Sequence, residues 1–240
     1  MNAEQHQPPP DGQRSGIGTL NEHSLHADLI QSLTQKGDMV EADVEGYVAD
    51  ILRIDAIIEV QTRQLASLKK KIAAFSENYQ VEIIHPITEN KWIVRKDLAG
   101  ETVSRRKSPK RGRVEDIFKE LVRARNLIDS TNVSLTILFI DAEEVWLDDG
   151  KGSWRRKHWS ISERHLVKIN HQLNFNSNHD FVNLIPPTIE QPFTNKQLAA
   201  QLGIRTNLAG KITYTLRKME VINFVSKTGN QYQFEINKDY

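Results

Sequence analysis

The acidic residues Asp50 and Glu59 offer the clearest chemistry in this sequence. They lie in two apolar segments, residues 46–52 and 56–62, whose composition and short polar connection predict a β-hairpin. In such a hairpin the two carboxylates fall nearly opposite each other, where like charges repel. Glu59 also interrupts a very apolar strand, and a buried unpaired charge is costly. A bound cation between the carboxylates explains this pattern, and oxygen ligands favour Mg²⁺ or Mn²⁺.

Three further side chains are candidates for the same site. Gln61 shares the strand face of Glu59, two residues away. Lys69 and Lys71 flank the apolar stripe of a helix predicted over residues 64–79, so either ammonium group can lean toward the acids, and we favour Lys71. Glu22 lies in the first turn of a helix that we expect to begin at Asn21.

Each of these candidates also has an explanation without chemistry. The hairpin can be an edge that faces solvent, with Arg53 or Arg63 paired to the acids. Lys71 can belong to a solvated helix face, and an acid in a first helical turn is favourable for the helix itself. His26 forms a metal-like pair with His23 at helical spacing, but without a nearby third ligand we interpret both as core or surface residues.

The order of these residues resembles the PD-(D/E)XK nuclease superfamily. Asp50, a hairpin, Glu59-Val60-Gln61 and a Lys-rich helix carry the resemblance, which covers roughly residues 20–94. The resemblance implies a restriction-endonuclease-like α/β fold, a mixed β-sheet core flanked by helices. It implies Asp50, Glu59 and Glu22 as metal ligands, with Gln61 in the position of the family's lysine. Ala49 stands where the family has proline.

Within this resemblance the reaction is metal-assisted phosphodiester hydrolysis, in which the acids fix a cation that activates water. The Glu-x-Gln form is similar to that of competence-associated nucleases. Gln61 supplies no positive charge, and Lys71 is the candidate to restore it. The alternative function is a catalytically inactive nuclease-fold regulator that binds DNA.

Basic and aromatic residues indicate nucleic acid as the partner. The segment 104–113 holds six Lys/Arg in ten residues, and residues 154–159 alternate tryptophans with cations on the expected second arm of a hairpin. We expect the first segment to be a mobile phosphate-contacting loop or simply a solvated one. The nucleic-acid-binding candidates in these two segments are Arg105, Arg106, Lys107, Arg155 and Arg156.

The last third of the chain predicts a small winged helix-turn-helix domain. Helices are expected over residues 193–202 and 206–219, with a hairpin over 221–236. Residues 193–240 carry seven Lys/Arg against three Asp/Glu, which favours nucleic acid over protein as the ligand. The candidate contacts on the second helix and the hairpin tip are Thr206, Asn207, Lys211, Arg217, Lys218 and Lys227.

Length and composition set the remaining expectations. The 240 residues, 38% hydrophobic and 26% charged, are typical of a globular protein. We expect a disordered tail over 1–18, a nuclease-like domain over 19–172 and the winged helix over 173–240. The absence of cysteine excludes disulfides and thiolate chemistry. Without a membrane-length apolar run or a leader, we expect a cytoplasmic protein that acts on DNA, with RNA as the alternative, and a homodimer if the DNA site is two-fold symmetric.

Overall fold

The computed structural model describes residues 17–238, with side chains from residue 24 onward. The first helix, α1 (Ile17–Leu33), begins four residues before the expected start, so Asn21 lies inside it and does not cap it. Most of the tail expected over 1–18, and the side chain of Glu22, therefore lie outside what the structure describes.

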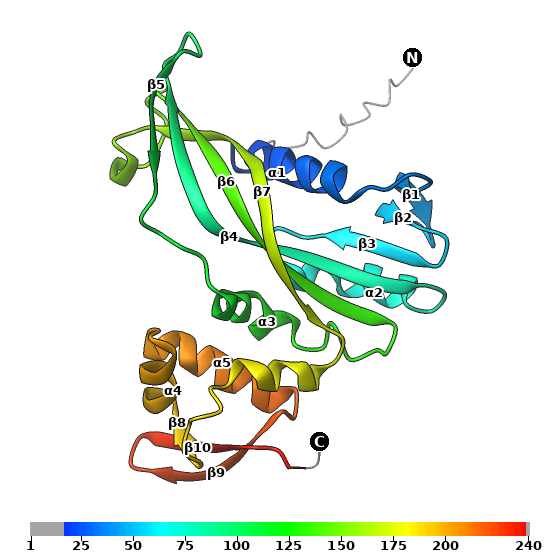
Figure 1. The fold of residues 1–240 in the computed structure, drawn as a ribbon, viewed down its shortest axis with the longest axis vertical. Coiled ribbons are helices and arrows are strands. Elements are labelled where there is room, and N and C mark those ends of the chain that lie inside the picture. Colours follow the sequence, from blue (N-terminus) through cyan, green and yellow to red (C-terminus); the bar gives the residue numbers. More distant parts are fainter. Residues whose placement is uncertain (1–16, 239–240) are drawn as a thin grey trace, which may run out of the picture.

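The larger part of the described chain is a mixed seven-stranded sheet flanked by helices, as expected (Figure 1). Its strand order is β1-β2-β3-β4-β6-β7, and β5 pairs with β4. The parallel pairs are β3 with β4 and β4 with β6, and the other pairs are antiparallel. The strand bounds are β1 (Met39–Val44), β2 (Tyr47–Leu52), β3 (Ala56–Val60), β4 (Gln80–Lys96), β5 (Thr102–Lys107), β6 (Val133–Leu147) and β7 (Ser160–Phe175).

Helices cover the two faces of this sheet. Leu25 and Leu29 of α1 pack with Ile58 and Ile84 on one face. The other face is covered by α2 (Lys69–Phe75) and α3 (Phe118–Ala124), which continue the short 3-10 helices η1 (Leu65–Leu68) and η2 (Val114–Ile117). The helix α2 is shorter than the helix predicted over residues 64–79, because that range includes the 3-10 helix η1 at its start and a turn after Phe75.

The long strands differ most from the sequence expectation. The strand β4 runs without interruption over 17 residues. Ser104 to Lys107 were expected in a mobile or solvated loop, but they belong to β5, an exposed strand on one edge of β4. That edge of β4 pairs first with β3 and then with β5.

The expected hairpin arm at 154–159 is also wrong. These residues form a short 3-10 helix, η3 (Trp154–Arg156), and a turn in which Lys157 and His158 have positive φ values of 53° and 65°. The true second arm is β7, a long strand that pairs with β6. Many of its residues face solvent, so it lacks the apolar run that identified β6.

The C-terminal part contains the expected helix–helix–hairpin sequence. After η4 (Asn178–Leu184) come α4 (Asn195–Leu202), α5 (Thr206–Lys218) and a three-stranded sheet of order β8-β10-β9, from β8 (Phe193–Thr194), β9 (Ile222–Thr228) and β10 (Gln231–Ile236). Thr194 caps α4 by accepting a hydrogen bond from the backbone N–H of Gln197.

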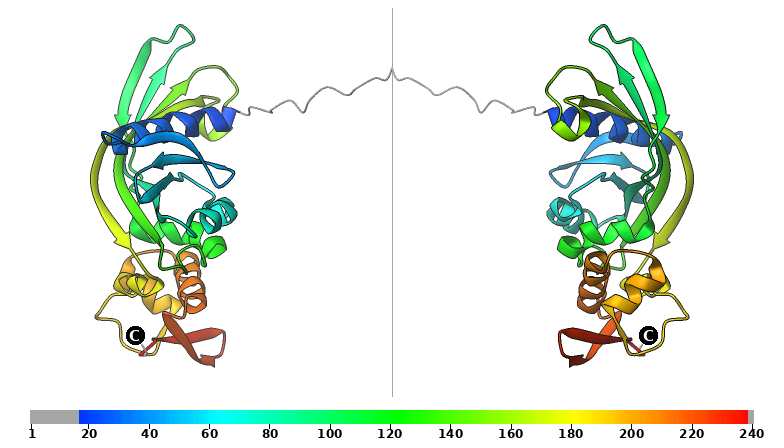
Figure 2. Two further views of the ribbon diagram at one scale, coloured as in Figure 1. Left: turned by 90° about the vertical axis from the view of Figure 1, so that its right-hand side faces the viewer. Right: turned by 90° about the vertical axis from the view of Figure 1, so that its left-hand side faces the viewer.

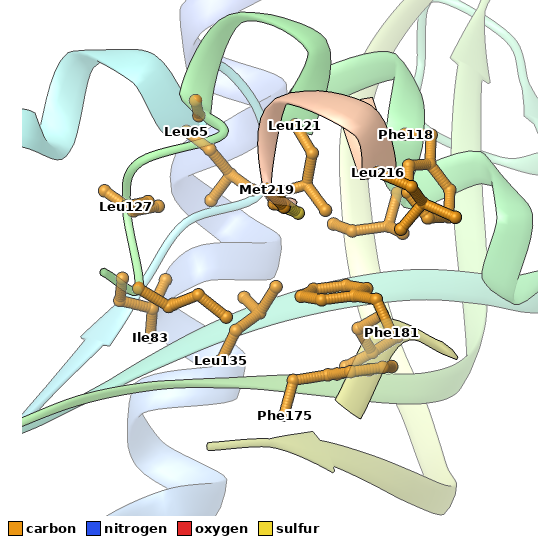
Figure 3. Packing of buried hydrophobic residues seen from close by; sticks show 14 of the residues in the cluster. Leu65, Ile83, Phe118, Leu121, Leu127, Leu135, Phe175, Phe181, Leu216 and Met219 are labelled. Atoms are coloured by element: carbon orange, nitrogen blue, oxygen red, sulfur yellow. The ribbon is translucent and has the colours of Figure 1, made fainter. Parts of the chain in front are cut away.

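This C-terminal part shares a core with the large sheet. Leu216 of α5 and Met219, directly after it, lie beside Phe118 and Leu121 of α3, as Figure 3 shows. The guanidinium of Arg113 donates hydrogen bonds to the backbone carbonyls of Leu202 and Gly203, at the end of α4. Figure 2 shows the resulting arrangement, with the C-terminal helices stacked below α3 at one end of the molecule.

Candidate active site

The hairpin β2–β3 brings Asp50 and Glu59 together, as the sequence predicted. Ile51 pairs with Ile58, and continuing this register sets the two acids opposite each other. The backbone N–H of Asp50 donates to Glu59 Oε1 at 3.1 Å, and that of Val60 donates to Asp50 Oδ2 at 2.8 Å. Each carboxylate thus satisfies a backbone group of the opposite strand, where the regular ladder has ended.

Glu59 is the buried member of the pair, and Lys71 is its counter-ion. Glu59 is 1% exposed, and Lys71 Nζ lies 2.5 Å from Glu59 Oε2. Burial, and then the neighbouring charge of Asp50, raise the pKa of Glu59 to about 7, although the hydrogen bond and charge of Lys71 oppose this. The structure therefore brings Lys71 of α2 to the acids from the helix face that the sequence indicated.

His26 of α1 is a contact that sequence reasoning missed. Its Nε2 lies 3.2 Å from Asp50 Oδ2, and this hydrogen bond raises the pKa of His26 against the effect of burial. His26 precedes the buried Ile30 by four residues, so both lie on one helix face, and that periodicity was the available signal. His26 and Ile30 also line a surface cavity of about 650 Å³ between α1 and β1.

Gln61 lies directly after β3 and is held by other bonds. Its side-chain amide donates to the carbonyl of Arg63, its backbone N–H donates to the carbonyl of Ile84 at 2.8 Å, and its own carbonyl contacts His85 Nδ1 at 2.8 Å. Burial lowers the pKa of His85. The Gln61 amide thus bonds within its own loop, and the structure brings Lys71, rather than Gln61, to Glu59.

The donor set fits a divalent cation in kind. Asp50 and Glu59 supply carboxylate oxygens, and Mg²⁺ in proteins is often held by one or two carboxylates together with water and substrate phosphate. Among residues 24–238, no group of three or more His, Asp or Glu side chains is arranged to hold a metal ion. A metal at this site would therefore take its remaining ligands from outside that set.

The basic residues of β5 divide between two faces. Arg105 forms an ion pair with Glu143 and lies over the ring of Trp92. Lys107 lies over the same ring. Arg106, between them, points to the other face and lines a cavity of about 740 Å³ together with Arg155 and Arg156. The structure therefore brings together three of the five basic candidates of this region, from segments far apart in sequence.

The same cavity has a buried ionic floor that sequence reasoning missed. Glu144 is 2% exposed, and its Oε2 accepts hydrogen bonds from Lys91 Nζ and an Arg164 amino nitrogen, both at 3.0 Å. Burial raises the pKa of Glu144, but its hydrogen bond from Trp146 and the charges of Lys91 and Arg164 outweigh burial and leave that pKa lowered. The signal was an acid within an apolar strand, the same signal that identified Glu59.

The C-terminal candidates lie on one side of α5 and on the hairpin. Thr206, Asn207, Arg217 and Lys218 are exposed and Lys211 is half-buried, while Lys227 lies near the hairpin tip over the ring of Tyr232. Two small cavities flank Tyr232, one reaching Arg217 and the other Thr206. The helix and the hairpin therefore present their polar side chains to one shared surface.

Comparisons with known proteins place the large sheet in a family. An uncharacterized protein of Treponema pallidum (strain Nichols) is 32% identical over 154 residues, which are 64% of this chain and 61% of that protein. No solved structure matches the chain. No helix within residues 17–238 is long and apolar enough to cross a membrane.

The family match covers α1 to β7, and so includes both the acidic pair and the basic cavity. It ends before α4, so the C-terminal helix pair and hairpin lie outside it. Over residues 23–176 the chain belongs to the family described as a domain of unknown function, DUF8091.

Proposed function

We propose that this protein is a divalent-metal-dependent nuclease that hydrolyses phosphodiester bonds of DNA at Asp50 and Glu59. The observation that carries the proposal is the convergence of these acids with Lys71 and His26 at the point where β2 and β3 diverge. A buried glutamate held by one lysine, beside a second carboxylate, is an expensive arrangement for stability alone.

The chain's own groups divide the work. Asp50 and Glu59 would hold Mg²⁺ or Mn²⁺, which supplies a polarised phosphate and a bound water of lowered pKa. The ammonium of Lys71 lies against Glu59, so it would supply the positive charge that Gln61 lacks and balance charge that develops on the phosphate. His26 would hold the Asp50 carboxylate in place through its hydrogen bond.

The C-terminal part supports the proposal as a nucleic-acid binder. A helix pair followed by a hairpin, in a sheet of order β8-β10-β9, is the element order of a winged helix-turn-helix domain. The exposed side of α5 bears Asn207, Arg217 and Lys218. We propose that this surface contacts duplex DNA while the acidic site cuts it.

The test compares three alanine variants of the same hairpin. Asp50→Ala and Glu59→Ala should abolish metal-dependent cleavage while DNA binding is retained. Asp55→Ala is the matched control, because Asp55 is an exposed acid in the turn between β2 and β3. Calorimetric titration with Mg²⁺ and Mn²⁺ should show binding to wild type that Glu59→Ala loses. Undiminished cleavage by purified Asp50→Ala and Glu59→Ala proteins would refute the site.

One observation favours a second candidate, a DNA-binding regulator without catalysis. Gln61 occupies the position that carries lysine in the resembled superfamily, and glutamine contributes no charge there. Its amide donates a hydrogen bond to the carbonyl of Arg63. This candidate predicts sequence-selective DNA binding that metal does not alter, and no cleavage under any metal. Binding assays with and without Mg²⁺ separate the two functions.

A further inference from the structure

The basic cavity between β4, β5, β6 and the η3 turn is a site separate from the acidic pair. Ile83 of β4 pairs with Glu59, and Lys91 at the cavity lies eight residues further along the same strand. At about 3.3 Å per residue, the two places are about 26 Å apart along β4. Figure 1 shows the β4–β5 end of the sheet well away from the β2–β3 hairpin.

The floor of the cavity consists of basic side chains that a buried carboxylate holds in place. Arg106, Ile93, Glu144 and Arg164 form one cross-strand row, since each pairs with the next in the ladder. The Glu144 carboxylate holds Lys91 and Arg164, whose side chains are 23% and 18% exposed, and it also accepts a hydrogen bond from Trp146 Nε1 at 2.8 Å. The two cations are therefore fixed in position and remain partly open to the cavity.

The charge of the lining is strongly unbalanced. Six Lys/Arg side chains line the cavity, against the single carboxylate of Glu144. Cations gathered at this density repel one another, and arginines in fixed positions are suited to bind phosphate through paired hydrogen bonds. The lining therefore favours the binding of an anion, and its arginines favour phosphate groups. The six cations are Lys91, Arg106, Lys110, Arg155, Arg156 and Arg164.

An exposed aromatic ring stands at the mouth of the cavity. Trp154 is 74% exposed, and the guanidinium of Arg155 lies 5.4 Å from its ring centre. The turn that carries it is closed tightly, because Gly152 N–H donates to the carbonyl of His158 at 2.7 Å and a Cβ on Gly152 would meet the Trp159 carbonyl. A solvent-facing tryptophan on a closed turn, beside basic side chains suited to phosphate, is a platform on which a base stacks.

We infer that this cavity binds a single-stranded segment of DNA, with its phosphates on the cationic floor and a base on Trp154. The volume of about 740 Å³ is that of a small-ligand pocket, which fits one or two nucleotides. The faces of bases in a duplex are covered by stacking, whereas those of a single strand are free. The inference rests on the proposed function in taking DNA as the ligand, and it specifies a substrate that has a single-stranded portion.

The test measures binding without cleavage. Fluorescence anisotropy of a labelled oligothymidylate, in EDTA, should show binding to the full chain that a blunt duplex competes for poorly. Trp154→Ala should weaken this binding by roughly 5- to 150-fold, since stacking contributes about 1–3 kcal/mol per base. Arg106→Ala should weaken it as well. Arg123→Ala is the matched control, because Arg123 is an exposed arginine of α3 that does not line the cavity.

Each outcome decides the inference. Loss of binding in Trp154→Ala and Arg106→Ala but not in Arg123→Ala supports it. Equal binding by wild type and the first two variants would overturn it, as would a duplex that competes as well as the single strand. Thymidine monophosphate binding as tightly as the oligonucleotide would assign the cavity to a free nucleotide instead. Because EDTA prevents cleavage, these results are independent of whether Asp50 and Glu59 cut DNA.

Discussion

Replacing Glu59 by glutamine should make the protein more stable relative to wild type as the pH rises. Burial and the charge of Asp50 raise the pKa of Glu59 from its ordinary value of 4.5 to about 7. The folded state therefore holds a proton on Glu59 more tightly than the unfolded state does. The stability that this proton contributes is complete below pH 4.5 and is lost as the pH rises through about 7. Glutamine does not titrate, so the variant escapes this loss.

The size of the effect follows from the two pKa values. A tenfold difference in proton affinity corresponds to about 1.4 kcal/mol. The interval from 4.5 to about 7 is therefore worth about 3 kcal/mol in total. Linkage places most of this total, about 2–3 kcal/mol, between roughly pH 5 and pH 8. The attraction between Lys71 and ionised Glu59 is already contained in the raised pKa of Glu59, so loss of this ion pair adds no separate change with pH.

The assay is urea unfolding of wild type and Glu59→Gln, in EDTA, at several values between about pH 5 and pH 8. The quantity to compare is the free energy of unfolding of the variant minus that of wild type, which should increase by about 2–3 kcal/mol across this range. His26, whose pKa is raised mainly by its hydrogen bond to Asp50, is present in both proteins, so its own titration largely cancels.

Asp55→Asn is the control for this measurement, because Asp55 is an exposed acid in the same hairpin. Its stability relative to wild type should change little with pH. If the difference for Glu59→Gln is equally flat, Glu59 stays ionised down to pH 5. In that case the attraction of Lys71 exceeds the effects of burial and of Asp50, and the reasoning is wrong.

Three further predictions concern Lys71 and the junction with the C-terminal part. Lys71→Met should lower the cleavage rate by about 10²- to 10³-fold, whereas Lys70→Met, at an exposed position of the same helix, should not; equal rates would remove Lys71 from the site. Arg113→Ala should cost about 1–3 kcal/mol in urea unfolding, because it leaves the buried Glu115 carboxylate without its guanidinium partner, whereas Arg111→Ala, which removes a more exposed ion pair, should cost less than about 0.5 kcal/mol. Phe118→Ala should lower the free energy of unfolding by about 3–5 kcal/mol. Its unfolding transitions should coincide when followed by circular dichroism and by tryptophan fluorescence, since all four tryptophans lie in the part of the chain that contains the large sheet. Separate transitions would contradict a shared core.

The sequence by itself determined the local features of this protein. The hairpin of Asp50 and Glu59 and the C-terminal helix–helix–hairpin order were both predicted. These features depend on neighbours a few residues apart, on apolar periodicity and on turn and capping residues, which a single sequence displays. The mixed sheet flanked by helices followed from the same patterns.

Only the tertiary structure decided which distant residues meet. Few residues of β5 and β7 are buried, so these strands lack an apolar pattern. They form because their backbones pair with the edges of β4 and β6. His26 reaches Asp50 because α1 packs across the sheet. Lys91, Glu144 and Arg164 come from three strands. No pattern of residue spacing within one strand indicates that these charges meet. Long-range pairing selects these contacts by burial and by complementary charge, and neither can be assessed from spacing along the chain.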